Sequence, residues 1–119
     1  MLQSLALVFV GGGIGSLARY SVSLGIRQFP AAVLPWATLI SNVTSCLVIA
    51  IALVLYGDKL SENMRLFLFV GFCGGFSTFS TFSVETLEII RRGEIWLAML
   101  NVLINVIFCL VVLTSFVRK

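Results

Sequence analysis

Four long apolar runs divide the sequence, and they limit the folds open to this chain more than any other feature. The runs cover residues 2–26, 36–56, 66–84 and 95–117. Each has about the 20 residues that an α-helix needs to cross the hydrocarbon core of a membrane. We therefore predict an all-α membrane protein with four transmembrane helices, in which residues 1–119 form a single domain. The short connections leave no room for a separate soluble domain.

The composition agrees with this prediction and excludes several classes of function. Hydrophobic residues make up 60% of the 119 residues and charged residues only 11%, whereas a soluble domain has roughly 25% charged residues. There is no histidine and no acid–base pair within an apolar run, so we do not expect an enzyme. The net charge of +3 is ordinary for loops beside anionic lipid and gives no indication of nucleic-acid binding.

The basic residues are shared evenly between the two sides of the predicted membrane. Four spans place both termini and the middle connection on one side. That side has Lys59, Arg65, Arg118 and Lys119, and the other side has Arg19, Arg27, Arg91 and Arg92. Because an excess of Lys and Arg normally fixes the orientation, an even count favours insertion in both orientations and pairing of two inverted copies. One fixed orientation is the alternative, since so short a chain has few charges to count.

The first run contains a glycine pair and a cation. Gly11 and Gly15 are four residues apart, a spacing that lets two helix backbones approach closely. Arg19 follows in the same run, where a cation costs at least about 2.5 kcal/mol on insertion scales. Its side chain either extends to the membrane surface or lies in an aqueous vestibule, and the sequence leaves both interpretations open.

Two of the other runs each have a polar face. In the second run the polar residues recur at spacings of three and four, which places them on one helical face: Thr38, Ser41, Asn42 and Ser45. Asn101 and Asn105 lie one turn apart in the fourth run. An amide inside a membrane either forms a hydrogen bond between helices or lines a polar path. For Asn42, the polar face around it favours the lining role.

The third run contains GFCGGFSTFSTFS, residues 71–83. Gly74-Gly75 is its least helix-favouring point, so we expect the third helix to be broken near this pair. Hydrocarbon cannot satisfy the backbone groups that a break frees, and the freed carbonyls are good ligands for a hard cation such as Na⁺. The glycines also suit close helix packing, because Gly71 and Gly75 have the same spacing as the pair in the first run. Both roles can hold at once.

The residues after this predicted break favour an anion. A new helix start has free N–H groups and partial positive charge. Phe76, Phe79 and Phe82 are expected to stack along one side, with the positive edges of their rings available to an anion. Five hydroxyl residues between 77 and 83 add hydrogen-bond donors, and no carboxylate precedes Glu85. A cation path would need rings of carbonyls or carboxylates, so the sequence indicates an anion pathway.

These motifs resemble those of a known family. GFCGGFSTFSTFS closely resembles the signature of the Fluc/CrcB fluoride channels, and GGGIGSLARY, TLISN and LNVLIN resemble other segments of the same family. The resemblance covers the whole chain. It implies a passive channel of the bacterial inner membrane that exports cytoplasmic fluoride, as an antiparallel dual-topology homodimer with two pores. The partners it implies are fluoride, a second inverted copy of the chain and membrane lipid.

The resemblance also implies roles for particular residues. Phe79 and Phe82 are similar to the paired pore phenylalanines of the family, and Asn42 is similar to its pore amide. The backbone carbonyls of Gly74 and Ser77, from both copies, are similar to the ligands of a central structural Na⁺. The remaining expectations are hydroxyl and amide groups near the path (Ser80, Thr81, Asn101 and Asn105) and vestibule or interface charges (Arg19 and Glu85).

Several positions depart from the family pattern and keep other interpretations open. Ala37, Ser45 and the pair Phe108-Cys109 replace residues that are usually small, and these changes could narrow a pore or alter helix packing. They leave open a heterodimeric fluoride channel of which this chain is one subunit. A small multidrug-type transporter also has four spans, but its proton coupling needs a carboxylate in the first helix, where this chain has only Arg19. A third alternative is a non-conducting subunit whose polar faces only hold helices together.

Overall fold

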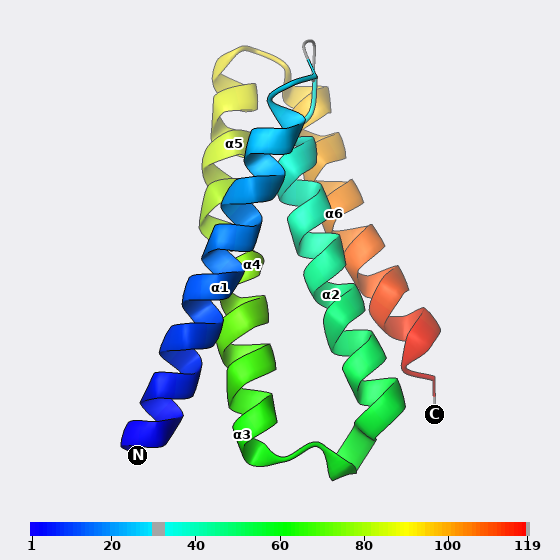
Figure 1. Ribbon diagram of the computed structural model, residues 1–119. Coiled ribbons are helices and arrows are strands. Elements are labelled where there is room, and N and C mark those ends of the chain that lie inside the picture. The colour runs from blue at the N-terminus through cyan, green and yellow to red at the C-terminus, as the bar shows by residue number, and fades with distance from the viewer. Residues whose placement is uncertain (30–32, 119) are drawn as a thin grey trace.

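The computed structural model describes residues 1–29 and 33–118, and all regular structure in these residues is helical. Three of the spans are single helices: α1 (Leu2–Ile26), α2 (Trp36–Tyr56) and α6 (Ile95–Phe116). Together with the segment Glu62–Arg91, they give four helical segments long and apolar enough to cross a membrane. The predicted all-α fold with four membrane-spanning helices is therefore confirmed (Figure 1).

The third span consists of several consecutive pieces. After the short helix η1 (Gly57–Lys59), the Ser61 hydroxyl caps the span by accepting a hydrogen bond from the Met64 N–H at 3.2 Å. The pieces that follow are α3 (Glu62–Arg65), the wider π-helical turns of η2 (Leu66–Cys73), α4 (Gly74–Phe76) and α5 (Phe79–Arg91). The span is thus longer at both ends than the predicted run of residues 66–84.

The third span is broken between α4 and α5, close to the expected position. Ser77 (φ −78°, ψ 157°) and Thr78 (φ −152°, ψ 121°) are extended, whereas Gly74 is helical with φ −63° and ψ −34°. The break therefore follows the glycine pair instead of falling within it. Thr78 favours this position because its hydroxyl accepts a hydrogen bond from the Thr81 N–H at 3.1 Å, which caps the start of α5.

Helix α1 packs against the first half of the third span through glycines on both sides. A Cβ atom added to Gly71 would lie 3.0 Å from the Cα atom of Gly11, and one added to Gly75 would lie 2.5 Å from the carbonyl oxygen of Gly12. A Cβ atom added to Gly15 would collide with the carbonyl oxygen of Phe72 in the third span. Both predicted glycine pairs thus allow direct backbone contact between these helices, as small residues do in membranes.

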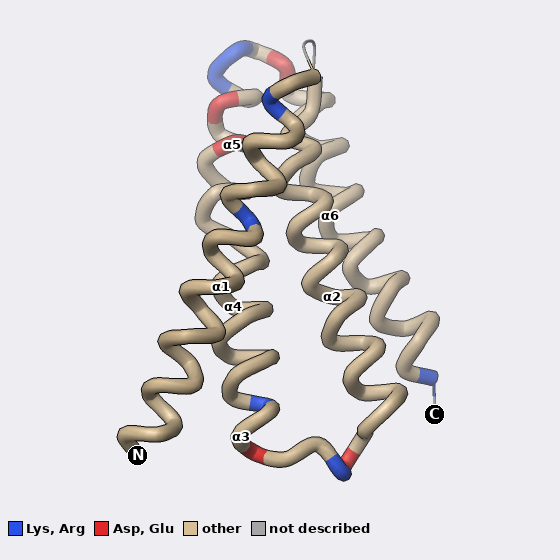
Figure 2. The backbone as a smooth tube through the Cα atoms, in the orientation of Figure 1, with Lys and Arg blue, Asp and Glu red and all other residues tan. Residues whose placement is uncertain are grey.

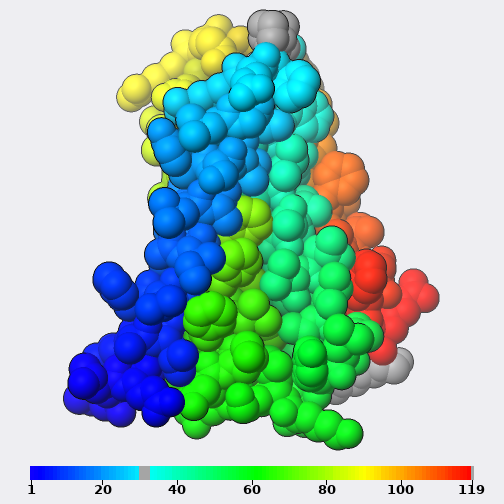
Figure 3. Space-filling view, viewed as in Figure 1, coloured from blue at the N-terminus to red at the C-terminus, as the bar shows by residue number. Residues whose placement is uncertain are grey.

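The helices form two groups that converge at one end of the molecule. Figure 1 shows α1 beside the first half of the third span, and α2 beside α6. The two groups meet at the end where α1 connects to α2 and α5 to α6, and they diverge toward the termini. Figure 3 shows atoms of α1 lying directly against those of the third span. The longest dimension is 47 Å, comparable to the roughly 40–45 Å of a bilayer with its headgroups.

The connections and most of the charges lie at the two ends, as the four-span prediction requires, whereas Arg19 and Glu85 lie within α1 and α5. Both termini and the middle connection are at one end, with Lys59, Arg65 and Arg118 (Figure 2). The opposite end has Arg27, Arg91 and Arg92. Residues 27–29 and 33–35 are non-helical, in agreement with the two prolines of that connection. Residues 30–32 and Lys119 lie outside the described part of the chain.

Candidate functional site

The candidate site is the break of the third span, and a side chain of α2 satisfies the backbone there. Asn42 Oδ1 accepts a hydrogen bond from the Thr78 N–H at 2.8 Å, and Asn42 Nδ2 donates to the Thr78 carbonyl at 3.4 Å. The Ser45 hydroxyl donates to the Cys73 carbonyl at 3.3 Å. Asn42 of the predicted α2 face therefore pairs the Thr78 N–H that the break frees, as a membrane interior requires. The Cys73 carbonyl, in contrast, keeps its helical bond from the Ser77 N–H at 2.9 Å.

A cavity of about 280 Å³ opens beside the break. It lies between α2, the start of α5 and α6. Its lining residues are Asn42, Cys46, Ser77, Thr78, Phe79, Phe82, Asn105, Val106 and Cys109. Within the described part of the chain, no charged side chain contributes to this lining. The structure thus gathers both phenylalanines and two of the three amides that the sequence indicated.

The phenylalanine rings form two separate pairs instead of one stack of three. Phe79 and Phe82 have ring centroids 5.7 Å apart and are tilted by 46°. Phe76 instead stacks on Phe72, at 5.5 Å, on the other side of the break. The expected stack of three is wrong because a three-residue spacing gives one face only within a continuous helix. Phe82 is buried, whereas Phe79 is 80% exposed in the single chain.

The hydroxyl groups of the motif divide into two classes. Those of Ser77 and Ser83 donate back to the carbonyl four residues earlier, at 2.7 and 2.8 Å. Those of Ser80 and Thr81 gather around the hydroxyl of Thr78, at 3.4 and 3.0 Å, at the start of α5. Ser80 and Thr81 therefore lie at the positive end of a helix, where donors favour an anion.

The two amides of α6 are connected to Asn42. Asn105 Oδ1 accepts from Asn42 Nδ2 at 3.2 Å, and Asn105 Nδ2 donates to Asn101 Oδ1 at 3.2 Å. Asn105 lines the cavity, whereas Asn101 is fully buried and does not. Asn101 Nδ2 donates to the Thr86 hydroxyl at 3.0 Å. Sequence reasoning missed Thr86, since only the packing of α5 on α6 brings it to an asparagine.

The carbonyls proposed for Na⁺ belong to the residues around the break. Within the described residues, no hydrogen bond reaches the carbonyl oxygens of Gly74 or Ser77. Unpaired carbonyls of an unwound helix are suitable ligands for Na⁺, so these residues fit the ion. Arg19 Nε donates to the neighbouring Gly75 carbonyl at 3.1 Å. Arg19 therefore meets the C-terminal end of α4, where a cation is favourable.

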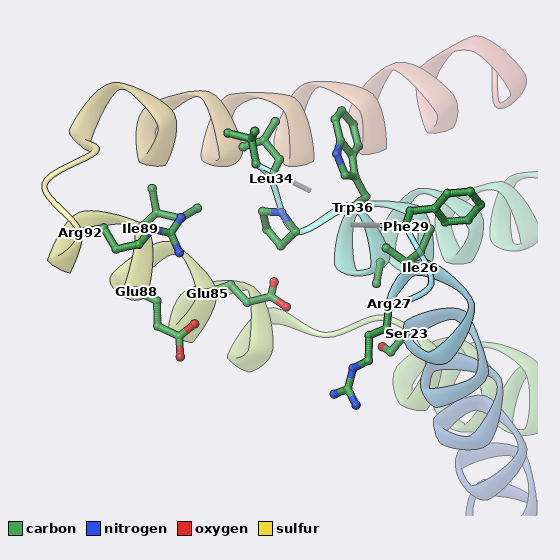
Figure 4. Close-up of a pocket in the computed structure, with 13 residues that line it drawn as sticks. Ser23, Ile26, Arg27, Phe29, Leu34, Trp36, Glu85, Glu88, Ile89 and Arg92 are labelled. Atoms are coloured by element: carbon green, nitrogen blue, oxygen red, sulfur yellow. The ribbon is translucent and has the colours of Figure 1, made fainter. Parts of the chain in front are cut away.

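A second cavity, of about 330 Å³, lies at the end where the two helix groups converge. Figure 4 shows charged side chains of both signs around it, including Glu85, Glu88, Arg27 and Arg92. Glu85 Oε1 accepts from the Thr38 hydroxyl at 2.9 Å. Its buried Oε2 atom has no hydrogen-bond partner within the described residues. Of the two expected vestibule charges, Glu85 lines this cavity and Arg19 does not.

Comparison with known proteins identifies the family. Residues 6–116 match the family model described as CrcB-like protein, Camphor Resistance (CrcB). The chain belongs to the CrcB family. The resemblance drawn from the motifs is thereby confirmed. Membership of the CrcB family and the four apolar helices together support the predicted multi-pass location in the bacterial plasma membrane.

Three CrcB relatives carry the name fluoride-specific ion channel FluC. The relative from Methylobacterium radiotolerans is 44% identical over 108 residues, which cover 87% of this chain and 74% of the relative. The one from Azobacteroides pseudotrichonymphae is 39% identical over 120 residues, or 98% and 96% of the two chains. The one from Pyrococcus furiosus is 45% identical over 111 residues, or 89% and 86%.

Proposed function

We propose that this chain forms a passive channel through which cytoplasmic fluoride leaves the cell. The observation that carries the proposal is the break at Ser77–Thr78, which Asn42 holds beside an uncharged cavity lined by Phe79 and Phe82. The names of the CrcB relatives support fluoride as the ion. As predicted, the family is one of ion channels and not of enzymes, which also argues against the multidrug-type alternative.

The groups around the cavity suit a small, strongly hydrated anion. Fluoride must exchange its water for other donors. Ser80 and Thr81 do not line the cavity, but they follow its lining residue Thr78 at the start of α5, where their hydroxyls add to the partial positive charge of a helix N-terminus. The edges of Phe79 and Phe82 add weak positive potential. Asn42 and Asn105 line the cavity with amides whose N–H groups are bonded within the protein, so these two residues shape the path and hold Thr78 in place. Because no Lys or Arg among residues 1–29 and 33–118 lines the cavity, the lining offers no cation that would hold the anion tightly.

The functional unit in this proposal is an antiparallel homodimer with two pores, embedded in lipid. Ser77 has fifteen residues of its span before it and fourteen after it, so an inverted copy would have its own break at the same depth. The even distribution of Lys and Arg gives neither orientation an advantage. Phe79, 80% exposed in the single chain, would contact the second copy.

Na⁺ at the centre of the dimer is the cofactor in this proposal. The unpaired carbonyls of Gly74 and Ser77 from each copy would hold it, because both breaks lie at the same depth. When bound, Na⁺ would supply positive charge that balances the carbonyl dipoles and joins the two copies. Arg19, at the neighbouring carbonyl, then belongs to the interface, and Glu85 belongs to the vestibule.

The deciding experiment is anion efflux from liposomes that contain the purified full chain alone. A fluoride electrode and a chloride electrode record the two anions in parallel, with protein-free liposomes as the control. We expect rapid loss of fluoride while chloride is retained. Loss of both anions would contradict selectivity. No efflux from a folded dimer would support the alternative in which this chain is one subunit of a heterodimeric fluoride channel.

A further inference from the structure

A continuous series of five hydrogen bonds runs through the interior and connects two points of the third span. It passes from the Thr78 N–H to Asn42 Oδ1 (2.8 Å), Asn42 Nδ2 to Asn105 Oδ1 (3.2 Å), Asn105 Nδ2 to Asn101 Oδ1 (3.2 Å), Asn101 Nδ2 to Thr86 Oγ1 (3.0 Å), and Thr86 Oγ1 to the Phe82 carbonyl (2.7 Å). We call this series the amide chain. It begins at the break, crosses α2 and α6, and ends on α5.

The two ends of the amide chain fix its direction. A backbone N–H can only donate and a backbone carbonyl can only accept, so the bonds point one way from Thr78 to Phe82. Asn105 provides a further constraint, because its Nδ2 also donates to the Asn101 backbone carbonyl at 3.0 Å. Each of the three asparagine amides therefore has one orientation that satisfies its neighbours.

Both donors of the Asn42 amide are also in use. Its Nδ2 group donates to the Thr78 carbonyl and to Asn105 Oδ1, and its Oδ1 atom accepts from the Thr78 N–H. Turning this amide over would set donor against donor at Thr78. Water has no access to the middle of the amide chain, because Asn101 is fully buried.

We propose that Thr86 and Asn101 are positioning residues for the ion path. Neither lines the cavity beside the break. Through Asn105, they hold Asn42, and with it the extended backbone of Thr78, in a single orientation. Aligned hydrogen bonds in a low-dielectric interior polarise one another, so the effect of Thr86 reaches Asn42 although the two do not bond directly. This inference rests on the proposed function and gives Asn101 a supporting role instead of contact with the ion.

Thr86→Val is the variant that tests the proposal. It keeps the shape of the side chain but removes the acceptor for Asn101. Thr86→Ser restores a hydroxyl. Thr114→Val is the matched control, because the Thr114 hydroxyl also donates to a carbonyl four residues earlier, at 2.8 Å, and takes no part in the amide chain. All three are made in the full chain with ¹⁵N-labelled asparagine, and the Asn42 side-chain resonance is identified by its loss in Asn42→Ala.

We expect Thr86→Val to shift the Asn42 side-chain amide resonance and to lower fluoride efflux by about tenfold or more, equivalent to about 1.4 kcal/mol. Thr86→Ser should restore both readouts, and Thr114→Val should change neither. An unchanged Asn42 resonance in Thr86→Val would overturn the proposal whatever the efflux. The resonance reports on the amide chain even if the unaltered protein conducts no fluoride, so the two proposals fail separately.

A double-mutant cycle covers the case in which Thr86→Val lowers the yield of folded dimer. The melting temperature is measured for Thr86→Val in the native background and in Asn42→Ala. The amide chain is already interrupted in Asn42→Ala, so Thr86→Val should lower the melting temperature less in that background than in the native one. Equal shifts in the two backgrounds would mean that Thr86 acts only on its local packing, which would overturn the proposal.

Discussion

Asn42 bonds to both backbone polar groups of Thr78, accepting from its N–H at 2.8 Å and donating to its carbonyl at 3.4 Å. One amide side chain thus gives the Thr78 N–H the acceptor that a continuous helix would supply, and adds a donor to the Thr78 carbonyl, which as the N-cap carbonyl also begins α5. In a membrane, an unpaired backbone group costs several kcal/mol, so this contact is what lets the third span remain extended at its midpoint.

Asn42→Asp should remove most fluoride efflux. Aspartate still accepts from the Thr78 N–H, but it sets an oxygen against the Thr78 carbonyl and against Asn105 Oδ1. Each such buried hydrogen bond costs about 1–3 kcal/mol when it is lost, and two are lost here, so we expect at least a roughly tenfold loss in the electrode assay. Asn63→Asp adds the same charge on the exposed surface of α3 and should leave efflux unchanged. Equal losses in both variants would contradict the explanation.

Phe82→Ile should abolish fluoride efflux while the dimer persists. Isoleucine keeps apolar bulk in this buried position but loses the ring edge, and with it the pair with Phe79. Efflux is measured beside size-exclusion chromatography, with Phe9→Ile as the control, because Phe9 is 81% exposed on α1. Undiminished efflux in Phe82→Ile would remove the rings from the mechanism.

Gly15→Ala should destabilise the protein, whereas Gly13→Ala should not. A Cβ atom at Gly15 would collide with the third-span backbone, and one at Gly13 has no atom within 4 Å. Overpacking costs about 1–3 kcal/mol, while an unhindered Gly→Ala change gains up to about 1 kcal/mol of helix propensity. Melting temperatures in detergent compare the two. A Gly15→Ala protein as stable as the parent would show that α1 can move away from the third span at little cost.

A cysteine at position 63 should react with a membrane-impermeant thiol reagent from both sides of the membrane. Asn63 is uncharged and exposed at the end that holds both termini, so Asn63→Cys leaves the balance of Lys and Arg intact. The parent chain, whose three cysteines lie within the spans, provides the background. Labelling from one side only would exclude insertion in both orientations and hence the antiparallel dimer.

Replacing Na⁺ by a large organic cation during purification should weaken the dimer. The unpaired carbonyls of Gly74 and Ser77 would then face one another without a charge between them. We expect a lower melting temperature and more monomer on size-exclusion chromatography, both reversed when Na⁺ is restored at the same ionic strength. An identical elution profile in the two buffers would count against the proposed central ion.

The sequence predicts the spans well because the membrane imposes a simple rule of length and polarity. The limits of residues 2–26 and 36–56 agree with α1 and α2. The break was expected near Gly74-Gly75 from helix propensity alone. Propensity does not include tertiary contacts, and here the glycines serve the contact with α1, whereas Asn42 stabilises the extended backbone at Thr78.

The side-chain roles at the site were only partly predictable. The polar face of the second run favoured a lining role for Asn42 over an interhelical hydrogen bond, and in the structure Asn42 lines the cavity and also forms hydrogen bonds to Thr78 and Asn105. The sequence could not predict which hydroxyls donate to the carbonyl four residues earlier. Ser77 and Ser83 do so and Ser80 does not, and these serines differ only in their position relative to the break. Thr86 becomes significant only through its contact with Asn101 on the neighbouring helix, fifteen residues later in the sequence.

The position of the chain ends has a consequence for how such a channel could evolve. Four helices bring both termini of this chain to the same end of the molecule (Figure 1). If two copies are inverted relative to one another, the C-terminus of one copy and the N-terminus of the other lie on opposite sides of the membrane. A gene that fused the two copies would therefore have to insert one additional spanning helix between them, and a duplicated channel of this design would have nine spans.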